Sequence, residues 1–140
     1  MENGDFVRAD LMTGATAVVA DFDSRVYASA KFGPSSLLVA TADRRLYRID
    51  TRTDRREVWG MTEADVTSLV RDPFTGRVLV AVRGGEVWEY SSRGERLGVF
   101  ASGGASGRIA YAADGYLYYM VVGWPTTPSV ARFELPRRLD

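Results

Sequence analysis

The 140 residues fit one globular domain, with 46% hydrophobic residues and 18 cationic side chains balanced by 18 anionic ones. The absence of cysteine and histidine excludes disulfides, thiolate or imidazole metal ligands, cysteine nucleophiles and serine–histidine catalysis, which favours a protein that is not an enzyme. No apolar run reaches the roughly 18 residues of a membrane span, and the acidic start has no signal-peptide core, so we expect a soluble cytoplasmic protein without membrane contact.

An internal repeat of about 41 residues organises the chain. The segment ending at Ala40 recurs at Ala81, and the segment around Tyr47 recurs around Trp88. We divide the single domain 1–140 into units 1–22 (partial), 23–63, 64–104 and 105–140 (partial). In chain order, strands are expected near residues 6–10, 18–19, 37–40, 46–50, 58–59, 66–70, 78–81, 87–91, 99–100, 115–120 and 130–134.

The segments within a unit have the strand signature, since they are short, rich in Val, Tyr, Trp and Phe, and separated by turn residues. Tyr47 and Ile49 superpose on Trp88 and Tyr90, so large side chains share one face of the strand while Arg48 and Glu89 take the other. Tight turns that accept positive φ are expected at residues 10–14, 50–54, 72–76, 83–85 and 114–115.

Four antiparallel strands in roughly 40 to 45 residues match one blade of a β-propeller. With the strands of a unit called A to D, the chain contains C and D, then two complete units, then A, B and C, which makes thirteen strands, eleven of them at the ranges given above. The second complete unit resembles a WD-repeat blade, although the Trp-Asp pair is absent, through Val66-Thr67-Ser68-Leu69-Val70, Asp72-Pro73, Gly76-Arg77-Val78-Leu79-Val80-Ala81, Gly84-Gly85 and Val87-Trp88-Glu89-Tyr90.

The first complete unit also resembles the blades of pyrroloquinoline-quinone-type bacterial propellers, through Leu38-Val39-Ala40-Thr41-Ala42-Asp43, Leu46-Tyr47-Arg48-Ile49-Asp50 and Thr53. Both resemblances imply an architecture and not one activity. The expected fold class is therefore all-β, a propeller-type array of four-stranded antiparallel meanders with about three blades per chain.

So few blades leave the ring open, with apolar sheet faces in water, so something else must cover them. Two copies arranged head to tail would give roughly six blades and favour a homodimer. The alternatives are a fragment of a longer protein, or a different chain that completes the propeller. If the last three strands of one chain and the first two of its partner formed one blade in the dimer, that blade would have five strands, one more than the four of a complete unit.

The D–A and B–C loops should emerge on one face of the disc and the A–B and C–D loops on the other. On the first face we single out four residues as a binding site: Arg44, Arg45, Arg83 and Trp124. Trp124 has no counterpart in the repeat and lies in the longest loop, as expected of a binding anchor. Four acidic residues could hold Ca²⁺ or Mg²⁺ through oxygen ligands, although ordinary solvated loops are favoured and no cofactor is expected: Asp21, Asp23, Glu63 and Asp65.

The segment from Arg44 to Arg56 contains six arginines and only two acidic residues, Asp50 and Asp54, so it carries an excess of positive charge. Arg44 and Arg45 belong to a B–C loop, whereas Arg52, Arg55 and Arg56 belong to a C–D turn at the other end of the blade. A solvated, salt-bridged edge is favoured over nucleic-acid binding, which needs one contiguous basic footprint and a surplus of cations. The recurring aromatic residues are expected to form core between blades.

Three function classes remain open at this stage. The favoured one is a non-enzymatic protein-interaction or structural assembly module with a protein partner. The second is a carbohydrate-binding, lectin-like propeller, and the third is a metal-assisted hydrolase or lyase with an acidic central site.

Overall fold

The computed structural model describes residues 4–22, 24–102, 107–111, 116–121 and 129–134, which form thirteen strands and no helix. The strands are β1 (Gly4–Ala9), β2 (Thr16–Phe22), β3 (Val26–Gly33), β4 (Ser36–Thr41), β5 (Arg45–Asp50), β6 (Arg56–Met61), β7 (Val66–Arg71), β8 (Val78–Val82), β9 (Glu86–Tyr90), β10 (Arg96–Ser102), β11 (Gly107–Tyr111), β12 (Tyr116–Val121) and β13 (Ser129–Glu134). Over these ranges the structure contains no helix long and apolar enough to cross a membrane.

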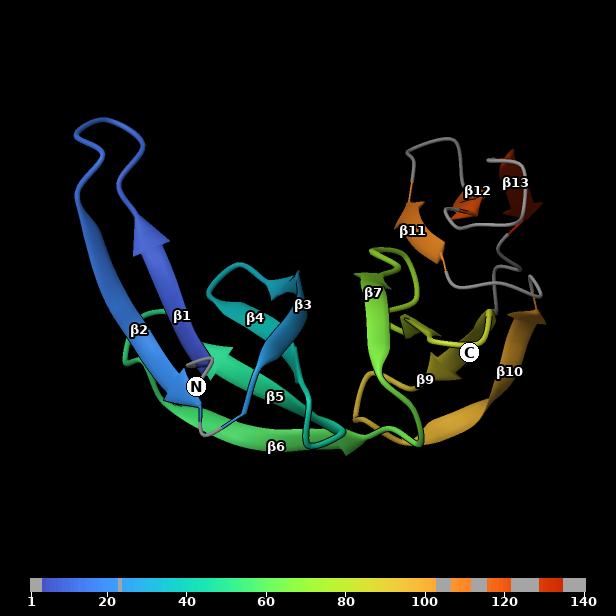
Figure 1. The fold of residues 1–140 in the computed structure, drawn as a ribbon, viewed down its shortest axis with the longest axis horizontal. Helices are drawn as coiled ribbons and strands as arrows, with labels where there is room; N and C mark the ends of the chain where they lie inside the picture. The colour runs from blue at the N-terminus through green and yellow to red at the C-terminus, as the bar shows by residue number, and fades with distance from the viewer. Residues whose placement is uncertain (1–3, 23, 103–106, 112–115, 122–128, 135–140) are drawn as a thin grey trace.

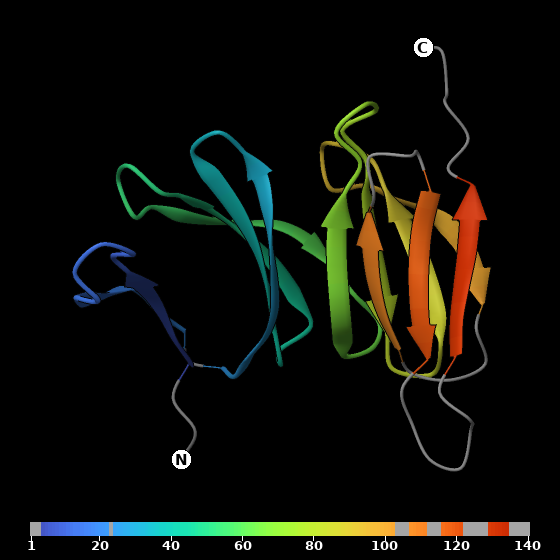
Figure 2. The same ribbon diagram turned by 90° about the horizontal axis from the view of Figure 1, so that it is seen from above.

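The strands form four antiparallel sheets, β1-β2, β3-β4-β5-β6, β7-β8-β9-β10 and β11-β12-β13. The expected all-β class is confirmed, as is the order of C and D, two complete units, then A, B and C. Figure 1 shows the sheets as successive blades of an open arc, with β3, β7 and β11 along its inner side and β2, β6 and β10 along its outer side. The β1–β2 hairpin and the β11–β13 sheet occupy opposite ends, which Figure 2 shows from above.

A bulge occurs at the equivalent place in three of the sheets. In each pair of C and D strands the register slips by one residue at this place, where it skips Val19, Trp59 or Phe100, and the β9–β10 pair has a second slip at Leu97. A bulge turns the strand locally, and here it aims the Trp59 and Phe100 rings at the following blade, where both pack against buried residues.

Three C–D or A–B turns share one construction. The turns begin at Asp10, Asp50 and Asp72. In each, the side-chain Oδ1 accepts a hydrogen bond from the backbone N–H two residues later, at 2.8 to 2.9 Å, and the backbone carbonyl accepts one from the N–H four residues later. The residue at that fourth position has positive φ, at Gly14, Asp54 and Gly76. The positive φ expected of these turns is therefore present, and Asp tolerates it because its short side chain can bond locally.

The core lies between blades. Buried residues of β4, β5, β7, β8 and β9 fill the space between the two four-stranded sheets, and Trp59 and Trp88 pack against them. A second cluster joins the β7–β10 sheet to Ile109 and Leu117, and a third joins Phe22 of the hairpin to Val39 and Ile49. The expectation that the recurring aromatics form core between blades is confirmed. Glu89, placed by alternation on the opposite face from Trp88 and Tyr90, is itself buried, because neighbouring blades cover both faces of β9.

Tyr90 ties two blades together and gives a testable pH dependence. Its ring is 1% exposed and its hydroxyl donates to the carbonyl of Met61 at 2.6 Å. Burial raises the pKa of the Tyr90 phenol. The contribution of this group to the free energy of unfolding is then constant below the unfolded pKa of about 10, and it is lost as pH rises through the folded pKa.

We expect Tyr90→Phe to lower the free energy of unfolding by about 1 kcal/mol at neutral pH, because Met61 loses a buried donor. The variant should also lose less stability than the wild type above pH of about 10, since the shifted phenol is gone. Urea unfolding at neutral and alkaline pH measures both effects. Equal alkaline losses in the two proteins would contradict the assignment.

Candidate interaction surfaces

The loops gather at two ends of the blades. At one end, called here the B–C end, residues 24–25 and 62–65 lead into A strands while turns 41–45 and 82–86 join B to C strands. Backbone bonds join them: Ala42 N–H to Arg25 O at 2.8 Å, Thr62 N–H to Arg44 O at 2.9 Å and Arg83 N–H to Asp65 O at 2.8 Å. At the other, the A–B end, lie turns 33–36, 50–56, 71–78 and 90–96.

The predicted basic candidates lie in the B–C turns but do not form one group. Arg44 sits at φ 63° within the β4–β5 turn, and Arg83 occupies the β8–β9 turn of the next blade. Arg45 is exposed, with a guanidinium nitrogen 3.5 Å from the Tyr47 hydroxyl and 3.9 Å from Asp43, and the contact with Tyr47, more than that with Asp43, raises the pKa of Arg45. Trp124 lies outside the described residues, so its part in binding stays a prediction.

The acidic candidates are also dispersed. The Glu63 carboxylate accepts a hydrogen bond from Arg96 at 2.7 Å. The backbone carbonyl of Asp65 accepts one from the Arg83 amide, and that of Asp21 accepts one from the Arg56 guanidinium. Asp23 lies outside the described residues. Within the described ranges, no three acidic side chains are grouped so that they could hold a metal ion. The calcium or magnesium site stays a prediction without a described ligand cluster.

The open face of the β1–β2 hairpin is revealed by comparing equivalent positions of the repeat. Position Ala9 on β1 corresponds to Ile49 on β5 and Tyr90 on β9. Ile49 and Tyr90 are 0% and 1% exposed because the preceding blade covers them, whereas Ala9 is exposed. Val7, equivalent to the packed residues Tyr47 and Trp88, is 49% exposed. The hairpin therefore presents a blade face with no blade on it.

The opposite end of the arc presents the complementary kind of face. Leu117 of β12 is fully buried against the β7–β10 sheet, as Val78 of β8 is against the preceding sheet. Side chains alternate along a strand, so Tyr118, which is partly buried, lies on the face of β12 opposite to Leu117. In β8 the equivalent face, with Leu79 and Ala81, packs against the following blade.

A group that sequence reasoning missed lies at the A–B end. Four arginines that had been assigned to a solvated edge border one cavity of about 530 Å³: Arg48, Arg52, Arg55 and Arg56. The separation of Arg44 and Arg45 from Arg52, Arg55 and Arg56 is present in the structure. The signal in the sequence was the dense run of arginines, but it did not show that Arg48 points to the same end as the turn.

Solved structures similar to this chain share its fold. Hydrazine synthase of Kuenenia stuttgartiensis matches 94% of this chain, with a TM-score of 0.77 and 14% sequence identity. The computationally designed Ika4 protein matches 95% of it, with a TM-score of 0.67 and 15% identity. The WD40 β-propeller domain of Doa1 matches 78% of it, with a TM-score of 0.65 and 12% identity. The chain spans 40% of the hydrazine synthase chain, 38% of the Doa1 chain and 81% of the Ika4 chain. No protein-family model and no curated protein matches the sequence. The propeller fold is confirmed, with unclosed sheets as in a partial propeller.

Proposed function

We propose that the chain is a non-enzymatic protein-interaction or structural assembly module, an open propeller arc whose two end faces dock against a second copy. The observation that carries this proposal is the exposure of Ala9 and Val7 at positions that are covered in the other blades. Burying such a face is the main source of stability in stacked sheets, so leaving it in water is costly.

The choice of a second copy rests on the interfaces already present within the chain. Each blade packs the face bearing Leu79 or its equivalents against the face of the following blade that bears Tyr90 or its equivalents. The hairpin presents the second kind of face, and β12 presents the first kind on the side opposite to Leu117. A head-to-tail pair of chains joins these two kinds of face at both junctions and closes the assembly.

The wider role follows from what the fold offers. Loops at both ends of the blades and a closed ring provide surfaces for a protein partner, as the WD-repeat resemblance implies. No grouping within the described residues favours the hydrolase alternative, and no described aromatic platform favours the carbohydrate alternative.

A pair of matched variants tests the docking. Val7→Asp places a charge on the open face, and we expect it to weaken association about 100-fold, because the carboxylate must be desolvated at the interface. Val99→Asp is the control, since Val99 is similarly exposed, 51% against 49%, but lies on the outer strand β10 of a blade that has neighbours on both sides.

Sedimentation velocity of the three full chains measures the association, and thermal melting shows that each variant is folded. The proposal is sustained if Val7→Asp sediments as a folded monomer while Val99→Asp matches the wild type. If both variants match the wild type, or a different chain is needed before the wild type associates, the self-docking is wrong.

A further inference from the structure

The A–B end of the first complete blade holds a cavity built from cationic side chains. Its volume is about 530 Å³, within the range of ligand sites, and it lies between the β3–β4 turn and the β5–β6 turn. The two turns are joined by a hydrogen bond from Thr51 N–H to Ser35 O at 2.9 Å. Ser35 and Ser36 add hydroxyls to the wall, so the lining offers donors from both turns.

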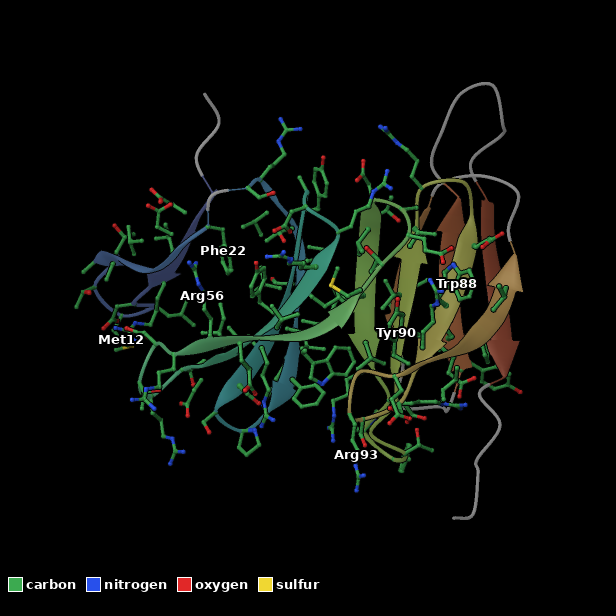
Figure 3. All side chains as sticks on the ribbon, turned by 90° about the horizontal axis from the view of Figure 1, so that it is seen from below. Met12, Phe22, Arg56, Trp88, Tyr90 and Arg93 are labelled. Atoms are coloured by element: carbon green, nitrogen blue, oxygen red, sulfur yellow. The ribbon has the colours of Figure 1, made fainter. Side chains whose placement is uncertain are left out.

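Two of the four arginines are held in place by aromatic rings. The Arg48 guanidinium lies 5.0 Å from the centre of the Phe32 ring. The Arg56 guanidinium turns to the opposite face of the blade, where it lies 4.6 Å from the centre of Phe22 and donates to the Asp21 carbonyl at 2.5 Å, and Figure 3 shows it beside Phe22. Stacking of this kind fixes a guanidinium plane and lowers the entropy lost when it binds a planar carboxylate.

The other two arginines keep most of their bonding capacity. Arg52 approaches Asp50 with its Nε at 3.7 Å, too far for a hydrogen bond, and its side chain is 76% exposed. No described residue accepts a hydrogen bond from the Arg55 guanidinium. Five donors on each guanidinium are therefore largely available at the cavity rim.

The carboxylates of the lining do not neutralise this charge. Asp50 is occupied in its turn, where its Oδ1 accepts the Arg52 amide at 2.8 Å, and this bond is the main cause of its lowered pKa. Glu57 is the second carboxylate, and no described arginine forms an ion pair with it. The four arginines and two carboxylates of the lining leave a net positive charge, and Asp50 and Glu57 are the groups that would repel an anion.

We infer that this cavity binds an acidic segment of a protein partner, with carboxylates held by Arg48, Arg52 and Arg55. A peptide is favoured over nucleic acid because the chain as a whole is neutral and the cations form a single cavity on one blade, not a stripe along the surface. The inference rests on the proposed interaction role, and it names the class of partner.

Binding of a short fluorescein-labelled polyglutamate peptide to the full chain, followed by anisotropy, tests the site, with polyglutamine and single-stranded RNA as comparison ligands. We expect the polyglutamate peptide to bind, binding to weaken as salt rises, and Arg55→Gln to weaken it about threefold. Arg48→Gln combined with Arg55→Gln should weaken it about tenfold, and Glu57→Gln should tighten it. Arg93→Gln is the matched control, because it removes the same charge from the equivalent turn of the next blade.

Equal losses from Arg93→Gln and Arg55→Gln, or no gain from Glu57→Gln, would show a diffuse charge effect and overturn the site. RNA binding as tightly as the acidic peptide would overturn the choice of partner. The sedimentation of each arginine variant must equal that of the wild type, so a failure of peptide binding is distinguished from a failure of self-docking.

Discussion

Replacing Gly94 with alanine should be among the most destabilising single changes in this protein, lowering the free energy of unfolding by about 4 kcal/mol. Gly94 has φ +89°, and a Cβ built there would overlap the carbonyl oxygen of Trp59 in the preceding blade. The turn approaches β6 this closely because the Trp59 indole donates to the Ser92 carbonyl at 3.3 Å. The alanine must push two blades apart or move both backbones.

Gly84→Ala separates the clash from backbone strain. Gly84 also has positive φ, +106°, but a Cβ there meets no atom within 4 Å. Its cost should be limited to strain, about 1 to 2 kcal/mol. Chemical unfolding of both variants measures the difference, and comparable losses would mean that the contact between turn 91–95 and β6 does not hold the blades together.

The second large effect is expected at the buried ion network of the β7–β10 sheet. Arg77, Asp72 and Glu89 are 4%, 3% and 7% exposed, with Arg77 NH1 3.0 Å from Glu89 Oε1 and Arg77 Nε 3.4 Å from Asp72 Oδ2. Arg77→Met should cost about 3 to 5 kcal/mol, because it leaves buried carboxylates without their cation. The loss should appear in urea unfolding as a lower midpoint.

A double variant gives the control. Arg77→Met with Glu89→Met removes both charges, and Asp72 remains bonded to the amide of Phe74 and the hydroxyl of Thr75. We expect the double variant to be more stable than Arg77→Met alone, since an apolar pair can replace a buried ion pair with little loss. If the double variant is the less stable of the two, the buried carboxylate is not the source of the cost.

The repeat made the strand order predictable. Its period of about 41 residues placed Tyr47 over Trp88 and Ile49 over Tyr90, and the bulges at Trp59 and Phe100 follow the same spacing. Local chemistry was equally readable at the turns, because an Asx bond and a positive φ depend on residues only a few positions apart. These features need no knowledge of the neighbouring blade.

Contacts between blades were not readable from the sequence. Alternation assigned Glu89 and Arg48 to the same face, yet Glu89 is buried beside Arg77 while Arg48 is exposed and stacks on Phe32. The difference arises because the partner at each position comes from another strand or turn, so equal positions in the repeat meet unequal surroundings. The same reason hid the arginine cavity, whose Arg56 is fixed by Phe22 of a separate sheet.

The most direct test of the open arc is the mass of the wild-type chain in solution. The chain mass is 15.4 kDa, and we expect light scattering over a range of concentrations to give twice that value, with dissociation accompanied by lower thermal stability. Both are expected because a pair would cover Ala9 and Val7, which are exposed in the single chain. A chain that stays at 15.4 kDa, folded and melting cooperatively down to low micromolar concentration, would contradict the account.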